Sequence, residues 1–287
     1  MLSVQPNKKF LNLNPRFWAY VKAVSQHTGY TVRNKGEVKV PGWKEIIETL
    51  ESLGVDKASV HEDSGPTDFG MLLLSYFEYR ATALNEGVKT NLMGLKDAKK
   101  LFKSLFKELK PQCPIPKNKQ KHEKKGPAYF TGIINMVIEA NLAGSGLECD
   151  FNPRSLTTFT SNTGLVRTLS RWIDGAFPGT VNPTAVWEIK EYYYTTTFGS
   201  RVADGIYESM LDGMELKELR DQENIDVHHY LFIDDYYTWW DCGRSYLCRI
   251  VDIMHMGLID EVLFGKEVTT RLPVLVKEWV KESKRSK

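Results

Sequence analysis

Apolar side chains in the first third of the chain recur every three or four residues, which is the spacing of one face of an α-helix. Residues 15–26 carry Phe17, Val21 and Val24 on such a face, and the pattern stops close to Gly29. The same spacing predicts further helices over residues 43–53, 69–84 and 95–109. The N-terminal region is therefore expected to be helical.

The pattern changes in the second half, where short apolar runs alternate with helical segments. Residues 165–174 and 184–190 predict two strands, and the glycine- and proline-containing residues 175–179 predict the turn between them. The polar residues 155–163 predict a loop. The remaining elements, in chain order, are a helix over 129–142, a helix over 200–211, a strand over 227–233, a helix over 244–256, a strand over 261–264 and a helix over 272–281. This order is typical of an α/β (α+β) fold with a mixed central sheet flanked by helices.

A stretch rich in proline and lysine separates the two halves. It has little apolar surface to bury, and its prolines interrupt any helix. The sequence therefore predicts a helical N-terminal domain over residues 1–110, a basic linker over 111–127 and a second domain over 128–287.

Composition excludes several classes of protein. Apolar residues make up 42% of the 287 residues and charged residues 26%, so a disordered chain is excluded. The net charge of +2 neither requires nor forbids a nucleic-acid partner. The four cysteines form no CxxC pair and the histidines no HExxH motif, which argues against a zinc site. With no signal peptide and no apolar run of membrane-spanning length, a cytoplasmic protein without a membrane partner is expected.

The stretch that carries candidate chemistry lies in the predicted hairpin. Asp174 ends its first strand, and Glu188 and Lys190 stand two residues apart on its second. Because side chains alternate between the faces of a strand, Glu188 and Lys190 share one face and Ile189 points to the other. If the strands pair, Asp174 lies beside Glu188, and two adjacent carboxylates repel each other unless a cation lies between them. Such oxygen ligands suit Mg²⁺, and a nearby lysine can orient the attacking water and neutralise charge on a phosphate.

An acidic residue followed two positions later by lysine also occurs elsewhere in the chain. The other matches begin at Glu37, Asp97, Glu108, Glu123, Glu215 and Glu282. With 36 acidic residues, a few such matches are expected by chance. Only Glu188 lies in an apolar strand that follows a strand ending in an acid. An exposed hairpin with a charge pair across its strands is the structural alternative.

Asp174, Glu188 and Lys190, together with the helix predicted after them, resemble the catalytic core of PD-(D/E)xK nucleases, the superfamily of most type II restriction endonucleases. The resemblance covers about residues 130–265, with Ile173 where the superfamily often has proline. It implies a restriction-endonuclease-like core and a Mg²⁺-dependent endonuclease that hydrolyses phosphodiester bonds of double-stranded DNA. A sequence-specific type II restriction enzyme is the expected form.

The resemblance also implies a role for each residue of the motif. Asp174, Glu188 and the backbone carbonyl of Ile189 are the expected ligands of Mg²⁺, for which Mn²⁺ can substitute, and Lys190 serves the attacking water. Many members of the superfamily supply a further acid from the helix before the hairpin. Glu139 is the natural candidate for that ligand, and an ordinary exposed glutamate is the alternative.

Several polar and basic residues are candidates for contacts with DNA. The helix start after the motif strand offers a hydroxyl and a guanidinium for a phosphate, although simple capping by the serine is an equal alternative. The lysine run can follow phosphates or be a solvated linker, and the polar loop can contact phosphates or base edges. The candidates are Ser200, Arg201, Lys119, Lys121, Lys124, Lys125, Thr158 and Asn162.

A restriction enzyme, the function that the resemblance implies, has three expected partners. They are double-stranded DNA, a second copy of the chain in a homodimer, and a DNA methyltransferase of the same restriction–modification system in phage defence. The N-terminal domain is then expected to help recognise the DNA. The alternatives are a repair, recombination or transposon-associated nuclease with the same fold, and a non-enzymatic DNA-binding protein that retains the fold.

Overall fold

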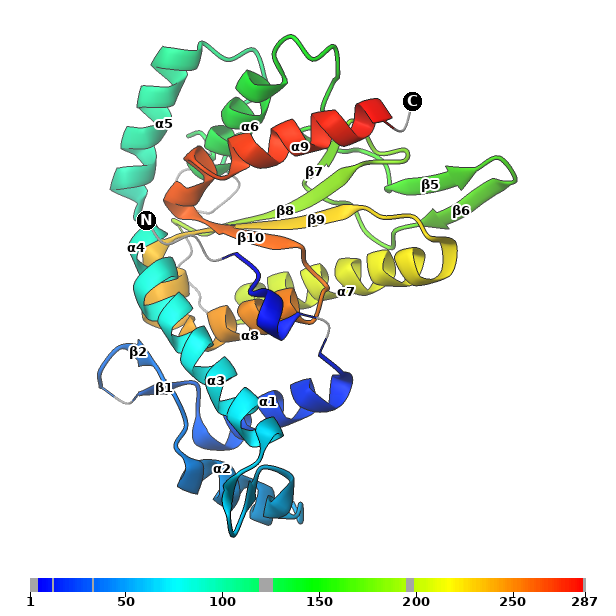
Figure 1. Ribbon diagram of the computed structural model, residues 1–287. Coiled ribbons are helices and arrows are strands. Elements are labelled where there is room, and N and C mark those ends of the chain that lie inside the picture. The colour runs from blue at the N-terminus through cyan, green and yellow to red at the C-terminus, as the bar shows by residue number, and fades with distance from the viewer. Residues whose placement is uncertain (1–4, 12, 33, 119–125, 195–198, 286–287) are drawn as a thin grey trace.

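The computed structural model describes residues 5–11, 13–32, 34–118, 126–194 and 199–285. Its centre is a four-stranded mixed sheet with the strand order β10-β9-β8-β7 (Figure 1). The strands are β7 (Gly175–Phe177), β8 (Ala185–Glu191), β9 (His228–Asp234) and β10 (Glu261–Phe264). β7 runs antiparallel to β8, whereas β8, β9 and β10 are parallel to one another. The expected mixed α/β architecture is confirmed.

Helices cover both faces of the sheet. On one face lie α5 (Leu95–Leu109), α6 (Tyr129–Leu142) and α9 (Leu272–Arg285), and on the other lie α7 (Ser200–Glu223) and α8 (Arg244–His255) (Figure 1). Side-chain alternation along β8 explains the division. Trp187 packs into the core with Trp279 of α9, whereas Glu188 and Lys190 point to the side of α7.

The N-terminal region is helical, as predicted, and has its own apolar core. Its helices are α1 (Pro15–Thr28), α2 (Trp43–Ser52) and α3 (Asp68–Thr82), followed by the π-helical η3 (Ala83–Val88) and the short α4 (Lys89–Asn91). Two small hairpins, β1 (Thr31–Val32) with β2 (Glu37–Val38) and β3 (His61–Glu62) with β4 (Gly65–Pro66), connect them. Short helical turns are η1 (Lys8–Phe10), η2 (Lys57–Ser59), η4 (Tyr237–Cys242) and η5 (Gly265–Thr269).

The strands that precede β8 differ from the prediction. The expected loop over 155–163 contains β5 (Thr158–Ser161), which pairs with β6 (Gly164–Thr168) in a separate hairpin that projects from the molecule (Figure 1). The expected strand over 165–174 therefore ends at residue 168, and the expected turn over 175–179 contains β7. β7 is buried along its whole length, because it lies between β8 and an isolated bridge from Asp150 to Ala176. Its pairing partners, rather than local sequence, make it a strand.

The boundary expected at residue 110 does not match the packing. α5 lies against α6, and Phe102 of α5 belongs to the same apolar core as Ile133 and Trp187. The segment from 95 to 109 therefore packs with the sheet and not with α1 to α3. Among the described residues, no helix combines the length and the apolar composition needed to cross a membrane.

Candidate active site

Asp174 is held at the point where β7 begins. Its backbone N–H donates to the carbonyl of Trp187 at 3.1 Å, and its Oδ2 accepts from the backbone N–H of Ile189 at 2.8 Å. The next residue has to be glycine, because a Cβ at Gly175 would lie 2.2 Å from the indole of Trp187. With Gly175 opposite Trp187 in the strand pair, Asp174 comes next to Glu188, the arrangement on which the sequence interpretation depended.

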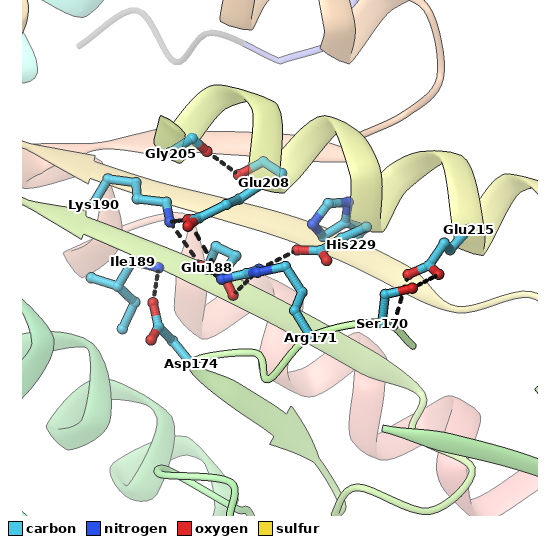
Figure 2. A network of polar contacts seen from close by, with 12 residues as sticks. Ser170, Arg171, Asp174, Glu188, Ile189, Lys190, Gly205, Glu208, Glu215 and His229 are labelled. Atoms are coloured by element: carbon cyan, nitrogen blue, oxygen red, sulfur yellow. Dashed lines mark hydrogen bonds and ion pairs between the residues drawn. The ribbon is translucent and has the colours of Figure 1, made fainter. Parts of the chain in front are cut away.

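Glu188 and Lys190 form a buried ion pair on the side of α7. Only 1% of Glu188 and 7% of Lys190 is exposed. The ammonium of Lys190 lies 2.9 Å from Oε2 of Glu188 and 2.8 Å from Oε2 of Glu208, which is on α7 (Figure 2). Gly205 leaves room for this lysine, because its Cα lies close to the Lys190 side chain and a Cβ would come within 3.2 Å of Cδ and Cε.

Arg171 brings a second cation to the same carboxylates. Its Nη1 lies 2.9 Å from Oε1 of Glu188 and 2.6 Å from Oδ2 of Asp212, and its Nη2 lies 3.5 Å from Oε2 of Glu208. Figure 2 shows Arg171 reaching Glu188 from the irregular segment before Asp174. Four carboxylates, those of Asp174, Glu188, Glu208 and Asp212, thus gather around two cations, Arg171 and Lys190.

The pKa values of these carboxyl groups reflect their burial first and the neighbouring charges second. Burial, reinforced by Glu188, raises the pKa of Asp174 to about 7. Burial also raises the pKa of Asp212 to about 7, with Arg171 opposing the shift and Glu188 adding to it. For Glu188, burial acts to raise the pKa, but Lys190 and Arg171 outweigh it and lower the pKa overall. The charged form of Glu188 is therefore stabilised by the cations, while two neighbouring carboxyls hold their protons unusually tightly.

A cavity of about 290 Å³ opens beside Asp174, along the part of β8 after Trp187 that β7 does not pair with. Its lining includes Asp174, Ile189, Glu191, Thr131 and Asn135. Asp174 lies deep among neighbouring atoms, yet its side chain remains accessible to solvent through this cavity. The N–H and C=O of one strand residue leave the backbone on the same side, so the carbonyl of Ile189 leaves β8 on the side of the N–H that contacts Asp174. Asp174 and Ile189 both line the cavity, and each has a hard oxygen donor on this side of β8.

These donors suit Mg²⁺ in chemistry and charge. Carboxylate and carbonyl oxygens are its preferred protein ligands, and a divalent cation offsets the two carboxylates in excess. In the described ranges, however, no three acidic, histidine or cysteine side chains lie close enough together to hold a metal ion. The Glu188 carboxylate contacts Arg171 and Lys190 on the side of α7.

The expected ligand Glu139 lies elsewhere. Its carboxylate accepts from the backbone N–H of Gln112 at 3.1 and 3.0 Å and lies close to the thiol of Cys113. None of its contacts joins it to Asp174 or Glu188. Glu139 therefore fixes the residues that follow α5, and the extra acids near the motif come from α7 instead.

The candidate DNA contacts are scattered. Ser200 and Arg201 are exposed at the start of α7, where Gly199 and not Ser200 occupies the capping position. Thr158 lies in the projecting β5–β6 hairpin, and Asn162 is exposed in its turn. Lys119, Lys121, Lys124 and Lys125 lie outside the described residues.

Sequence reasoning missed Arg171, Glu208 and Asp212. The sequence did contain a signal for Glu208 and Asp212. They are four residues apart, so they share one face of the helix that follows the motif strand. Arg171 stands three residues before Asp174 in a segment without periodicity, so nothing in the sequence marked its direction. Buried His229 also lies near the network, and burial lowers its pKa while its Nδ1 donates to the carbonyl of Leu258.

Comparison with known families assigns the chain to a family without naming a function. Residues 93–279 match the family described as Domain of unknown function (DUF7687), and residues 4–87 match Domain of unknown function (DUF7690). Because the first match covers more than half of the chain, the protein belongs to the DUF7687 family. No curated protein and no solved structure matches the chain.

Proposed function

We propose that this protein is a Mg²⁺-dependent DNA endonuclease with its active site at the open edge of β8. The observation that supports this most is the hydrogen bond from the Ile189 N–H to Asp174 at one accessible cavity, which Ile189 also lines between Glu188 and Lys190 in β8. The excess of carboxylates over cations around the motif supports a site that takes a divalent cation. The resemblance to PD-(D/E)xK nucleases implies Asp174, the Ile189 carbonyl and Glu188 as metal ligands, although the Glu188 carboxylate here contacts Arg171 and Lys190.

Each residue has a distinct part in the proposed reaction. Asp174, the Ile189 carbonyl and Glu188, once its carboxylate turned from Arg171, would hold the metal. Mg²⁺ in that position would supply a Lewis acid for the phosphate and lower the pKa of the attacking water. Lys190 keeps its positive charge, because Glu188 and Glu208 raise its pKa against the opposing effect of burial. It can therefore orient the water and offset charge on the phosphate, but it does not act as a free base.

DNA is the proposed substrate because a basic residue lines the cavity. Lys117 and Asp174 both belong to the lining. Lys117 therefore offers a positive charge to a phosphate that enters the cavity beside Asp174. Cleavage of a defined duplex site, in a restriction–modification system with a methyltransferase and a dimeric enzyme, is the specific form that we propose.

Cleavage assays with isosteric variants test the proposal. Asp174→Asn, Glu188→Gln and Lys190→Met should each lower the rate of Mg²⁺-dependent plasmid cleavage by about 100-fold or more, because metal placement and water activation are lost. Mn²⁺ should replace Mg²⁺, whereas Ca²⁺ should support DNA binding with little cutting. Supercoiled plasmid, linear duplex and branched or flapped DNA should be compared, so that a site-specific enzyme is distinguished from a structure-specific one.

The matched control is Glu108→Gln. Glu108 begins the same acid-x-lysine pattern, but it is exposed on α5. Glu215 is unsuitable for this purpose, because it accepts from the N–H and hydroxyl of Ser170, beside Arg171. Cleavage at the parental rate by both Glu188→Gln and Lys190→Met would overturn the assignment of this motif.

A further inference from the structure

Arg171 binds the carboxylate of Glu188, which is one of the ligands that the proposed metal site needs. Both its terminal nitrogens contact Glu188, at 2.9 Å to Oε1 and 3.2 Å to Oε2, and Nη1 also contacts Asp212. A guanidinium that spans two oxygens of one carboxylate fills much of the space in which a cation could bind it. Glu188 is therefore directed toward α7 by a cation that belongs to the protein.

The backbone on both sides of Arg171 is fixed, while its side chain reaches the surface. Ser170 donates its N–H to Glu215 at 3.1 Å, and Asp174 donates its N–H to Trp187 at 3.1 Å. The Arg171 side chain is nevertheless 23% exposed, compared with 9% for Lys190. Of these two cations, Arg171 is the one that can leave Glu188 without disturbing the sheet.

We propose that Arg171 and a divalent cation exchange at Glu188, and that Arg171 transfers to a DNA phosphate when the metal binds. The inference rests on the proposed function and adds a regulatory step to it. In the DNA-free protein Arg171 keeps metal affinity low. A phosphate beside the site offers the guanidinium another bidentate acceptor and frees Glu188 to join Asp174 and the Ile189 carbonyl. Metal binding and DNA binding then strengthen each other, as linkage requires.

Metal titration of the DNA-free protein tests the exchange without an activity readout. Mn²⁺ binding should be measured by isothermal titration calorimetry for the parent protein, Arg171→Gln, Glu188→Gln and the control Arg167→Gln. Arg167 contacts Glu218 on the outer side of α7, at 3.1 Å, so it carries the same charge near the same helix outside the site. Arg171→Gln should bind Mn²⁺ about tenfold more tightly, Arg167→Gln should match the parent protein, and Glu188→Gln should lose binding.

A DNA-binding measurement separates exchange from simple loss of a competing charge. With Ca²⁺ present, Arg171→Gln should bind duplex DNA about tenfold more weakly than the parent protein, because one phosphate contact is lost. Arg171→Lys keeps the charge without the two-pronged geometry and should fall between the parent protein and Arg171→Gln in both assays. Arg171→Lys also keeps a counter-charge for Glu188 and Asp212. If Arg171→Gln does not fold, both measurements can therefore still be made with Arg171→Lys.

The outcomes distinguish the two proposals. Mn²⁺ binding by the parent protein with the same or weaker affinity in Arg171→Gln and Arg171→Lys overturns the exchange and leaves the nuclease assignment intact. Tighter Mn²⁺ binding without any loss of DNA affinity overturns the transfer to phosphate. Absence of Mn²⁺ binding in the parent protein and in every Arg171 variant overturns both the exchange and the proposed metal site.

Discussion

Glu188 of β8 and Asp174, the residue before β7, are neighbours in the strand pair, but their carboxylates contact different partners. Glu188 is buried against two cations, whereas Asp174 accepts from one backbone N–H and faces a cavity. The spacing of Asp174, Glu188 and Lys190 in the sequence was enough to predict that they lie together. It could not predict the direction of Glu188, which depends on Arg171 and on two acids of α7.

Asp212 gives a prediction about stability and pH. It is fully buried, and one of its oxygens has no hydrogen-bond partner among the described residues. Its pKa is about 7 in the folded protein, against about 3.9 in an unfolded chain. Between these values the folded state binds the extra proton, so the free energy of unfolding falls as pH rises from about 4 to about 7 and is then level.

Asp212→Asn should therefore weaken the pH dependence of stability. The decrease in unfolding free energy between pH 5 and pH 8 should be smaller than in the parent protein, by on the order of 2 kcal/mol, as measured by urea denaturation. Asp174 has a pKa shifted in the same direction, so part of the slope remains. Asp204→Asn, at an exposed position of the same helix, should retain the parental slope. An equally steep slope in Asp212→Asn would show that Asp212 is ionised throughout this range.

At the scale of elements, the long periodic segments were predictable and the short paired ones were not. The sequence identified β8 and β9 and the helices around them, because each has enough apolar residues to reveal that it is buried. It missed β7, which is three residues long and begins with glycine. It also read the threonine- and serine-rich β5 as a loop. β5 is a strand because it pairs with the adjacent β6, and β7 because it pairs with β8 and bridges to Asp150. The side-chain pattern of such short segments carries little trace of this pairing.

Helix α7 was expected to end near residue 211 and continues to Glu223. Gly213 lies inside it, where a Cβ would come 2.1 Å from the backbone carbonyl oxygen of Leu258. The glycine thus lets α7 approach the segment before β10, which positions Glu208 and Asp212 over β8. The close contact with Leu258 therefore explains why a glycine, which lowers helix propensity, stands at position 213 inside α7.

Gly213→Ala should destabilise the protein by about 2 kcal/mol or more, because the new methyl group meets rigid backbone and forces the helix to shift. Gly205→Ala is the matched comparison on the same helix. Its Cβ would lie 3.2 Å from side-chain atoms of Lys190 and Tyr192, a looser contact with side chains and not with backbone, so a smaller effect is expected. Thermal and urea unfolding of both variants measure the difference. Equal effects would mean that the close contact with Leu258 does not determine the position of α7.

For the whole molecule, the two regions matched by different families are joined by a buried polar contact. Arg80 of α3 pairs with Asp252 of α8 at 3.0 Å, and the two side chains are 1% and 4% exposed. Tyr76 donates to the same carboxylate at 2.6 Å, and Arg80 also donates to Ser25 of α1 at 3.0 Å. A single carboxylate of the sheet-bearing region thus organises charged and polar groups of the N-terminal helices.

Asp252→Asn should consequently destabilise both regions together. It leaves the buried guanidinium of Arg80 without its counter-charge, a change that typically costs about 3–5 kcal/mol. Hydrogen exchange measured by mass spectrometry should rise in peptides from α1 and from β8 alike. Glu48→Gln is the control, because it removes an exposed pair with Lys44 on α2. It should change the free energy of unfolding of either region by no more than about 0.5 kcal/mol. Faster exchange confined to α1–α3 would instead show that the N-terminal helices unfold independently of the sheet. The proposed DNA site would then depend on residues 93–279 alone, and a protein reduced to that region should retain the metal-binding behaviour of the whole chain.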